Sequence, residues 1–100
     1  MVTVHIENEV VDFDSWKAAF DKFERFRRDH GVQRYRVSRV VGDENRVVID
    51  LDFEDIEDAK AFRVGLEKIW STPQSSRELV DHASAVLLDV VAHQSWAQAI

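Results

Sequence analysis

The chain has 100 residues, a formal net charge of −6 and no cysteine. Its length and its apolar share of 45% predict one packed domain with a modest core rather than a disordered chain. The acidic charge argues against a general nucleic-acid binder, the lack of cysteine excludes disulfides and thiolate metal sites, and no apolar run approaches the roughly 20 residues that span a bilayer.

Residues 2–8, VTVHIEN, alternate between apolar and polar side chains and therefore predict a β-strand. Its apolar face carries Val2, Val4 and Ile6. Its polar face carries Thr3, His5 and Glu7. Asn8, at the exit of the strand, has the parity of the apolar face.

Apolar residues then recur at helical spacing and predict a helix that is capped by Asp12 or Asp14 and ends at His30. Gly31 is expected to close this helix in the left-handed conformation. The stripe of the helix that we expect to be buried is Trp16, Ala19, Phe20, Phe23 and Phe26. The basic cluster Arg25, Arg27 and Arg28 is interleaved with acidic residues, and we expect it to form a solvated face; the alternative is a patch that binds phosphate or an acidic partner.

Two strands joined by a hairpin are expected next, over residues 32–41 and 46–53, with the loop at residues 42–45. A second amphipathic helix follows, capped by Asp55 and ending near Trp70. Thr72 and Pro73 resemble the start of another short helix, which would run to about His82. Residues 83–93 read as the last strand, and residues 93–100 as a C-terminal tail.

The element order β-α-β-β-α-β predicts an α+β fold of the ferredoxin-like type, formed by residues 1–100 as a single domain. Right-handed crossovers place both helices on one face of a four-stranded antiparallel sheet. The first and third strands are expected in the middle of that sheet.

The helix-free face of this sheet predicts a homodimer. The last strand is apolar on both faces, with Val86, Leu88 and Val90 on one and Leu87 and Val91 on the other. The strand at 32–41 adds Tyr35, Val37 and Val41 on one face, and Val32 and Val40 on the other. Burial on both faces requires a second covering layer, and we expect a second copy of the sheet to supply it.

Two stretches carry a family resemblance, VVDFDSWKAAFDKFERFRRDHGVQRYRV and NRVVIDLDFEDIEDAKAF. They resemble the dimeric α/β-barrel superfamily, which includes small polyketide cyclases and antibiotic-biosynthesis-type monooxygenases. Most of the resemblance lies in the helix start at Asp12, Trp16 and Lys17 and in the turn at Arg27, Arg28, Gly31 and Val32. The resemblance implies a barrel of two facing sheets, with a ligand between the sheet and the helices of each protomer.

His5 is the first candidate catalytic residue. It shares the polar face with Glu7, and Asp50 and Asp52 on the neighbouring strand have the same parity. A carboxylate beside the imidazole could make it a general base. The alternative is a polar cluster that sets the register of the dimer.

His82 is the second candidate, either as an acid–base catalyst or as an axial ligand of haem. Haem-degrading members of the superfamily place an Asn on strand 1, a Trp on helix 2 and a His downstream, which Asn8, Trp70 and His82 would match. The structural alternative is a histidine that interacts with the carbonyl groups of a helix end. The four histidines lack the spacing of metal ligands, so no metal site is expected.

Three functions follow as hypotheses. The first is an enzyme without a tightly bound cofactor that cyclises or oxygenates an apolar, aromatic or polyketide-like molecule. Its binding residues would be Asn8, Trp16, Phe20, Phe23 and Trp70, unless these side chains simply fill the core. The second is a dimeric binding or structural module without catalysis, and the third is a haem-binding monooxygenase. The N-terminus shows no signal peptide, so we expect a cytoplasmic protein.

Overall fold

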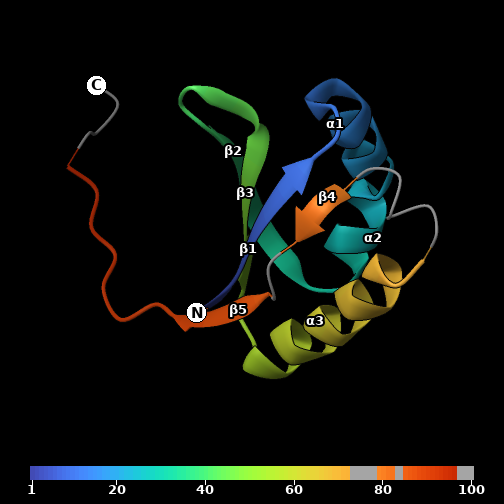
Figure 1. The fold of residues 1–100 in the computed structure, drawn as a ribbon. Helices are drawn as coiled ribbons and strands as arrows, with labels where there is room; N and C mark the ends of the chain where they lie inside the picture. Colours follow the sequence, from blue (N-terminus) through green and yellow to red (C-terminus); the bar gives the residue numbers. More distant parts are fainter. Residues whose placement is uncertain (73–78, 83–84, 97–100) are drawn as a thin grey trace.

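The computed structural model describes residues 1–72 and 85–96, and residues 79–82 by their backbone. The described residues form three helices packed on one face of an antiparallel sheet, which leaves the other face of the sheet without helices (Figure 1). The helices are α1 (Phe13–Lys22), α2 (Glu24–Asp29) and α3 (Ile56–Trp70). The strands are β1 (Val2–Val10), β2 (Val32–Val40), β3 (Asp43–Phe53), β4 (Leu79–His82) and β5 (Val86–Asp89).

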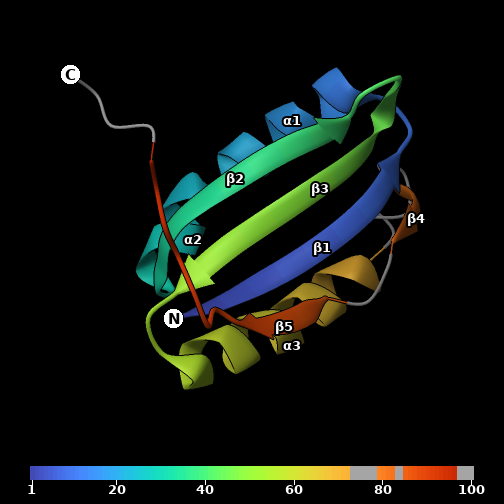
Figure 2. The same ribbon diagram turned by 90° about the vertical axis from the view of Figure 1, so that its left-hand side faces the viewer.

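The sheet has the predicted order, with β1 and β3 in the middle and β2 on one edge. The other edge of β1 pairs with two short strands in succession: β4 faces the second half of β1, and β5 faces the first half (Figure 2). In this register Asn8 lies opposite His82, and His5 lies opposite Val86. The single last strand of the prediction is therefore replaced by two.

The predicted short helix through His82 is wrong for Leu79–His82, which form β4. The backbone groups of this segment pair with the edge of β1, and an unpaired edge would leave hydrogen-bonding groups unsatisfied. The start of that helix, at residues 73–78, lies outside the described residues. β5 is also shorter than the predicted strand, and residues 90–96 have no regular secondary structure.

The predicted first helix is divided in two at Phe23. The Phe23 N–H donates to the carbonyl group of Phe20 at 3.1 Å, a three-residue spacing that tightens the turn and ends α1. The predicted ends of the pair are confirmed, because the Asp12 carboxylate accepts from the backbone N–H of Ser15 at 3.0 Å and Gly31 has φ of +97°. The Asp55 cap of α3 is confirmed in the same way, by a 2.9 Å bond from the Glu57 N–H.

The hairpin between β2 and β3 is tighter than predicted, because β3 already begins at Asp43 and only Val41 and Gly42 form the turn. Gly42 has φ of +91°, a conformation that glycine adopts without steric cost at the second central position of a turn. A register shift between Val32 and Arg34 also moves Val32 to the helix side, with Tyr35 and Val37. The predicted placement of Val32 on the opposite face is therefore wrong.

The core lies between the sheet and the helices, where Val4, Val10, Val47, Leu51 and Phe53 are fully buried. Trp16 from α1 and Ala59 and Phe62 from α3 complete it. No helix among the described residues is long and apolar enough to cross a membrane.

Candidate ligand-binding cavity

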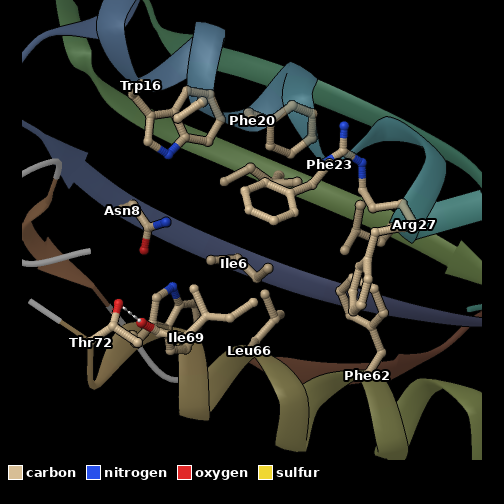
Figure 3. Close-up of a pocket in the computed structure, with 15 residues that line it drawn as sticks. Ile6, Asn8, Trp16, Phe20, Phe23, Arg27, Phe62, Leu66, Ile69 and Thr72 are labelled. Atoms are coloured by element: carbon tan, nitrogen blue, oxygen red, sulfur yellow. Dashed lines mark hydrogen bonds between the residues drawn. The ribbon is translucent and has the colours of Figure 1, made fainter. Parts of the chain in front are cut away.

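A cavity of about 190 Å³ lies between the sheet and all three helices (Figure 3). Its floor is formed by side chains of β1 and β3, and its walls by side chains of α1, α2 and α3. The five predicted binding residues all line it: Asn8, Trp16, Phe20, Phe23 and Trp70. The helix-side aromatic stripe therefore packs around a space instead of filling it.

The aromatic wall of the cavity is held by ring contacts along α1. The ring centroids of Trp16 and Phe20 lie 5.1 Å apart, and Phe20 meets Tyr35 of β2 edge-on at 5.3 Å. Trp16 is buried, whereas Phe23 is exposed over 48% of its surface. The wall thus has a buried part at Trp16 and a solvent-facing part around Phe23, at the junction of α1 and α2.

Asn8 is the polar residue on the floor of the cavity. It is only 4% exposed, and its Oδ1 atom has no hydrogen-bond partner among the described residues. Asn8 points to the helix side of β1, as its place in the alternation predicts. Figure 3 shows its amide near Trp16. A buried carbonyl oxygen without a donor costs about 1–3 kcal/mol, so the site gains from a ligand that donates a hydrogen bond.

Arg27 is a second polar residue of the cavity, and the prediction that it belongs to a solvated face is wrong. It is 5% exposed, while Arg25 and Arg28 are exposed as expected. Its Cζ atom lies 3.6 Å from the centroid of the Phe20 ring, which stacks the guanidinium on the aromatic wall. The signal in the sequence is the spacing, because Arg27 follows Phe20 by seven residues and Phe23 by four, on one helical stripe.

The surroundings of Arg27 include one ion pair. Its Nη2 atom lies 3.4 Å from Oε2 of Glu24, and the same oxygen accepts a 2.6 Å bond from the Tyr35 hydroxyl. The hydrogen bond from Tyr35, followed by the contact with Arg27, lowers the pKa of Glu24 against the opposing effect of desolvation. Nε of Arg27 is buried and has no partner among the described residues.

His5 lies on the helix-free face and does not line the cavity. Its Nδ1 atom is 2.6 Å from Oδ1 of Asp50, and its Nε2 atom is 3.2 Å from Oε2 of Glu7. The hydrogen bond with Asp50 raises the pKa of His5, partial burial opposes this, and Glu7 adds to it. The structure thus brings together the predicted His5 cluster on the face opposite the binding residues.

Two other histidines lie at the ends of secondary-structure elements: His82 ends β4, and His30 follows α2. β4 puts the backbone of His82 opposite that of Asn8, while its side chain lies outside the described residues. His30 ends α2, where its Nδ1 atom lies 2.8 Å from the carbonyl oxygen of Phe26. In the part of the chain that the structure describes, no three His, Asp or Glu side chains gather as metal ligands.

Comparison with known proteins places this geometry in context. No protein-family model and no curated protein sequence matches the chain. A solved structure of a dimeric ferredoxin-like protein from an uncultured marine organism is similar, with a TM-score of 0.70, 15% identity, and coverage of 93% of this chain and 97% of that one. The chain has the ferredoxin-like fold. An antibiotic biosynthesis monooxygenase is also similar, with a TM-score of 0.59, 16% identity, and coverage of 92% of this chain and 100% of that one.

The ferredoxin-like fold predicted from the element order is therefore confirmed. In this fold the helices pack on one face of the sheet, and the cavity lies between these two layers. At this level of identity the similarity concerns the fold, so the function must be argued from the residues of the cavity.

Proposed function

We propose that this protein binds a small hydroxylated aromatic molecule in the helix-side cavity and acts on it as a monooxygenase- or cyclase-like enzyme without a tightly bound cofactor. The observation that carries the proposal is an apolar, largely aromatic cavity with the unpartnered Oδ1 atom of Asn8 on its floor. The antibiotic biosynthesis monooxygenase of similar fold supports the reaction class.

The size of the cavity limits the ligand. A dry apolar cavity of about 150 Å³ accepts benzene, whereas pockets for drug-sized ligands measure about 300–1,000 Å³. At about 190 Å³, the cavity between Trp16 and Leu66 suits one aromatic ring with one or two substituents. A larger polyketide would have to extend past Phe23 toward solvent.

The chemistry would begin at the hydroxyl group. The Asn8 amide oxygen accepts a hydrogen bond from this hydroxyl group and thereby orients the ring against Trp16 and Phe20. A base next to Asn8 would then take the proton, which breaks this hydrogen bond and leaves an electron-rich phenolate. In an oxygenation, one atom of dioxygen would enter the ring and the other would leave as water, with the substrate itself supplying the electrons and being oxidised to a quinone. We assign this base to His82, because its backbone lies opposite Asn8 in the sheet.

A pair of isosteric probes tests the binding step. Trp16 and Trp70 line the cavity and report on it by fluorescence, and replacing the 87% exposed Trp96 by Phe removes the third signal. We expect saturable quenching by p-cresol, and weaker binding of p-xylene by roughly tenfold because it lacks the hydroxyl group. Equal affinity for the two probes, or no saturable binding of either, would contradict the proposal.

A non-catalytic binding module is the competing function, and the same cavity would serve it. The two differ in turnover: the enzyme consumes hydroxylated aromatic compounds or dioxygen, and His82→Ala slows this by about 10²-fold or more while p-cresol still binds. Binding without any turnover by the wild type would favour the module.

We propose further that a second copy covers the helix-free face. Val86 and Leu88 on this face are 48% and 43% exposed, next to the cluster of His5, Asp50 and Glu7. A self-complementary face of this kind suits a two-fold dimer, and the similar marine protein is described as dimeric. In this arrangement His5 has a structural role, in which it fixes the register of the two sheets.

Haem binding remains the least favoured prediction. A porphyrin is larger than the molecules that a cavity of about 190 Å³ accepts, so haem would require α3 to move away from the sheet. Titration with haem tests this, since a Soret shift that disappears in His82→Ala would support the ligation.

A further inference from the structure

We propose that Arg27 makes the cavity selective for aromatic carboxylates that also carry a hydroxyl group, with the carboxylate at Arg27 and the hydroxyl at Asn8. This inference rests on the proposed function and names the substrate class of the same cavity. The class is that of para-hydroxylated aromatic acids, of which p-hydroxybenzoate is a minimal example.

The first argument is the burial of a cation. Arginine is rarely buried without a full set of partners, yet Arg27 is 5% exposed and belongs to an almost entirely aromatic and aliphatic lining. Folding already removes most water from the guanidinium. The binding of an anion therefore adds little further desolvation cost on the side of the cation.

The second argument is the shortage of partners around the guanidinium. The group carries five N–H donors in a planar fork, and a carboxylate can accept two of them side by side. Among the described residues, its hydrogen-bond partners are Oε2 of Glu24 at 3.4 Å, which also accepts from Tyr35, and the Tyr35 hydroxyl, whereas Nε has none. Glu24 is half-exposed and can be solvated elsewhere, so its contact does not saturate Arg27.

The third argument is the arrangement of the two polar residues. Asn8 projects from β1 beside Trp16, whereas Arg27 extends from α2 with its guanidinium against Phe20. Figure 3 shows the two at opposite ends of the cavity, with the apolar side chains of Phe23 and Ile6 in the middle. The apolar middle of the cavity thus separates a hydrogen-bond acceptor from a cation. A ring with substituents at opposite ends matches this order.

A structural role for Arg27 is the competing explanation. Its guanidinium stacks on Phe20 at 3.6 Å and lies 5.0 Å from the centroid of Tyr35, and these contacts alone could hold α2 on the sheet. In that case a carboxylate on the ligand would bring no gain in affinity. The two explanations therefore differ in a measurable quantity.

The experiment compares three probes on the same protein: p-cresol, p-hydroxybenzoate and the methyl ester of p-hydroxybenzoate. The acid and the ester share the ring and the hydroxyl group and differ mainly in charge. We expect the wild type to bind the acid at least about tenfold more tightly than the ester, with an advantage that shrinks as salt is added. Equal or weaker binding of the acid would overturn the inference.

Variants then locate the effect. Arg27→Gln is expected to remove the advantage of the acid while p-cresol still binds, and Arg27→Lys to retain part of it because the charge stays but the fork is lost. Arg28→Gln is the matched control, since Arg28 is the exposed neighbour on the same helix, and it should change nothing. An advantage that persists in Arg27→Gln would assign selectivity to another residue and contradict the inference.

Two failures remain distinguishable. If none of the three probes binds the wild type, the proposed function itself fails. If p-cresol binds but the acid shows no advantage over the ester, only the role of Arg27 fails. The comparison of acid with ester uses the wild type, so it decides the matter even if Arg27→Gln does not fold.

Discussion

Asn8 is the residue at which stability and binding oppose each other. Its side chain is buried with an unpartnered carbonyl oxygen, and it occupies a β-strand position that an apolar side chain would fill without penalty. A fold selected for stability alone has no use for an amide there. The amide is therefore best explained by what enters the cavity.

Asn8→Leu is expected to raise the free energy of unfolding by about 1 kcal/mol, because the unsatisfied oxygen is removed. The same change is expected to weaken p-cresol binding to the level of p-xylene. Chemical denaturation and fluorescence titration measure the two effects. A destabilised variant with unchanged p-cresol affinity would show that Asn8 serves packing only.

His5 makes stability depend on pH in a definite direction. Because its pKa is raised in the folded state, chiefly by Asp50, the protonated imidazole stabilises the fold fully below its unfolded pKa of about 6.5, and this stabilisation is lost as the pH rises through the folded value. His5→Gln should therefore cost about 1 kcal/mol more near pH 6 than near pH 9. Denaturation of both proteins at the two pH values checks this, and a cost that grows with pH would contradict it.

At the scale of single elements, two glycines differ in the space that is available for a side chain. Gly31 closes α2 with φ of +97°, and a Cβ atom there would lie 2.9 Å from Oδ2 of Asp58. Gly65 lies inside α3, and a Cβ atom there would have no neighbour within 4 Å. The close packing that a helical glycine could permit is thus absent at Gly65.

Gly31→Ala is expected to destabilise the protein by about 1–2 kcal/mol, through the left-handed backbone and the contact with Asp58. Gly65→Ala should instead stabilise it by about 0.5–1 kcal/mol, because alanine favours a helix. Thermal unfolding of the two variants gives the comparison. A gain in stability for Gly31→Ala would refute the role assigned to the left-handed turn.

Most elements could be predicted because their signals are local. Alternation marks β1 and β3, and caps and glycines mark the helix ends at Asp12, Gly31 and Asp55. β4 could not be predicted, because Leu79–His82 owe their extended form to the edge of β1, a partner about 70 positions away along the chain. The break at Phe23 likewise follows from backbone hydrogen bonds that no residue type announces.

The candidate site was also predicted only in part. Parity and helical period placed Asn8 and the aromatic residues on one side of the sheet, and the structure gathers them around the cavity. Arg27 was missed because a charged residue between two other arginines reads as solvated, although its spacing places it on the aromatic stripe, where it stacks on Phe20. Whether a stripe of rings encloses a space depends on packing volumes, which the order of residues does not encode.

For the whole molecule, the helix-free face is the feature that an isolated protomer leaves unexplained. Figure 2 shows no helix on this face, although the chain after β5 crosses in front of part of it, and the face carries both the apolar pair Val86 and Leu88 and the charged cluster around His5. This mixed apolar and charged face is the surface that we propose for the contact between two copies.

The double change Val86→Lys with Leu88→Lys is expected to convert a dimer into a monomer, because it places two cations in the proposed interface. Val64→Lys is the control, since Val64 is at least as exposed as the pair but lies on α3. Sedimentation equilibrium distinguishes the species. A monomeric wild type, or a double variant that stays dimeric, would reject the sheet-face dimer.

Both proposals about ligand binding depend on the cavity, which side chains of the sheet and of all three helices line. Ala19→Leu fills it from the wall of α1, whereas Ala18→Leu adds the same atoms on the exposed side of that helix. The most direct measurement is the affinity of p-cresol for these two variants by tryptophan fluorescence. We predict that Ala19→Leu loses saturable binding while Ala18→Leu binds like the wild type; equal binding by both would contradict a functional cavity.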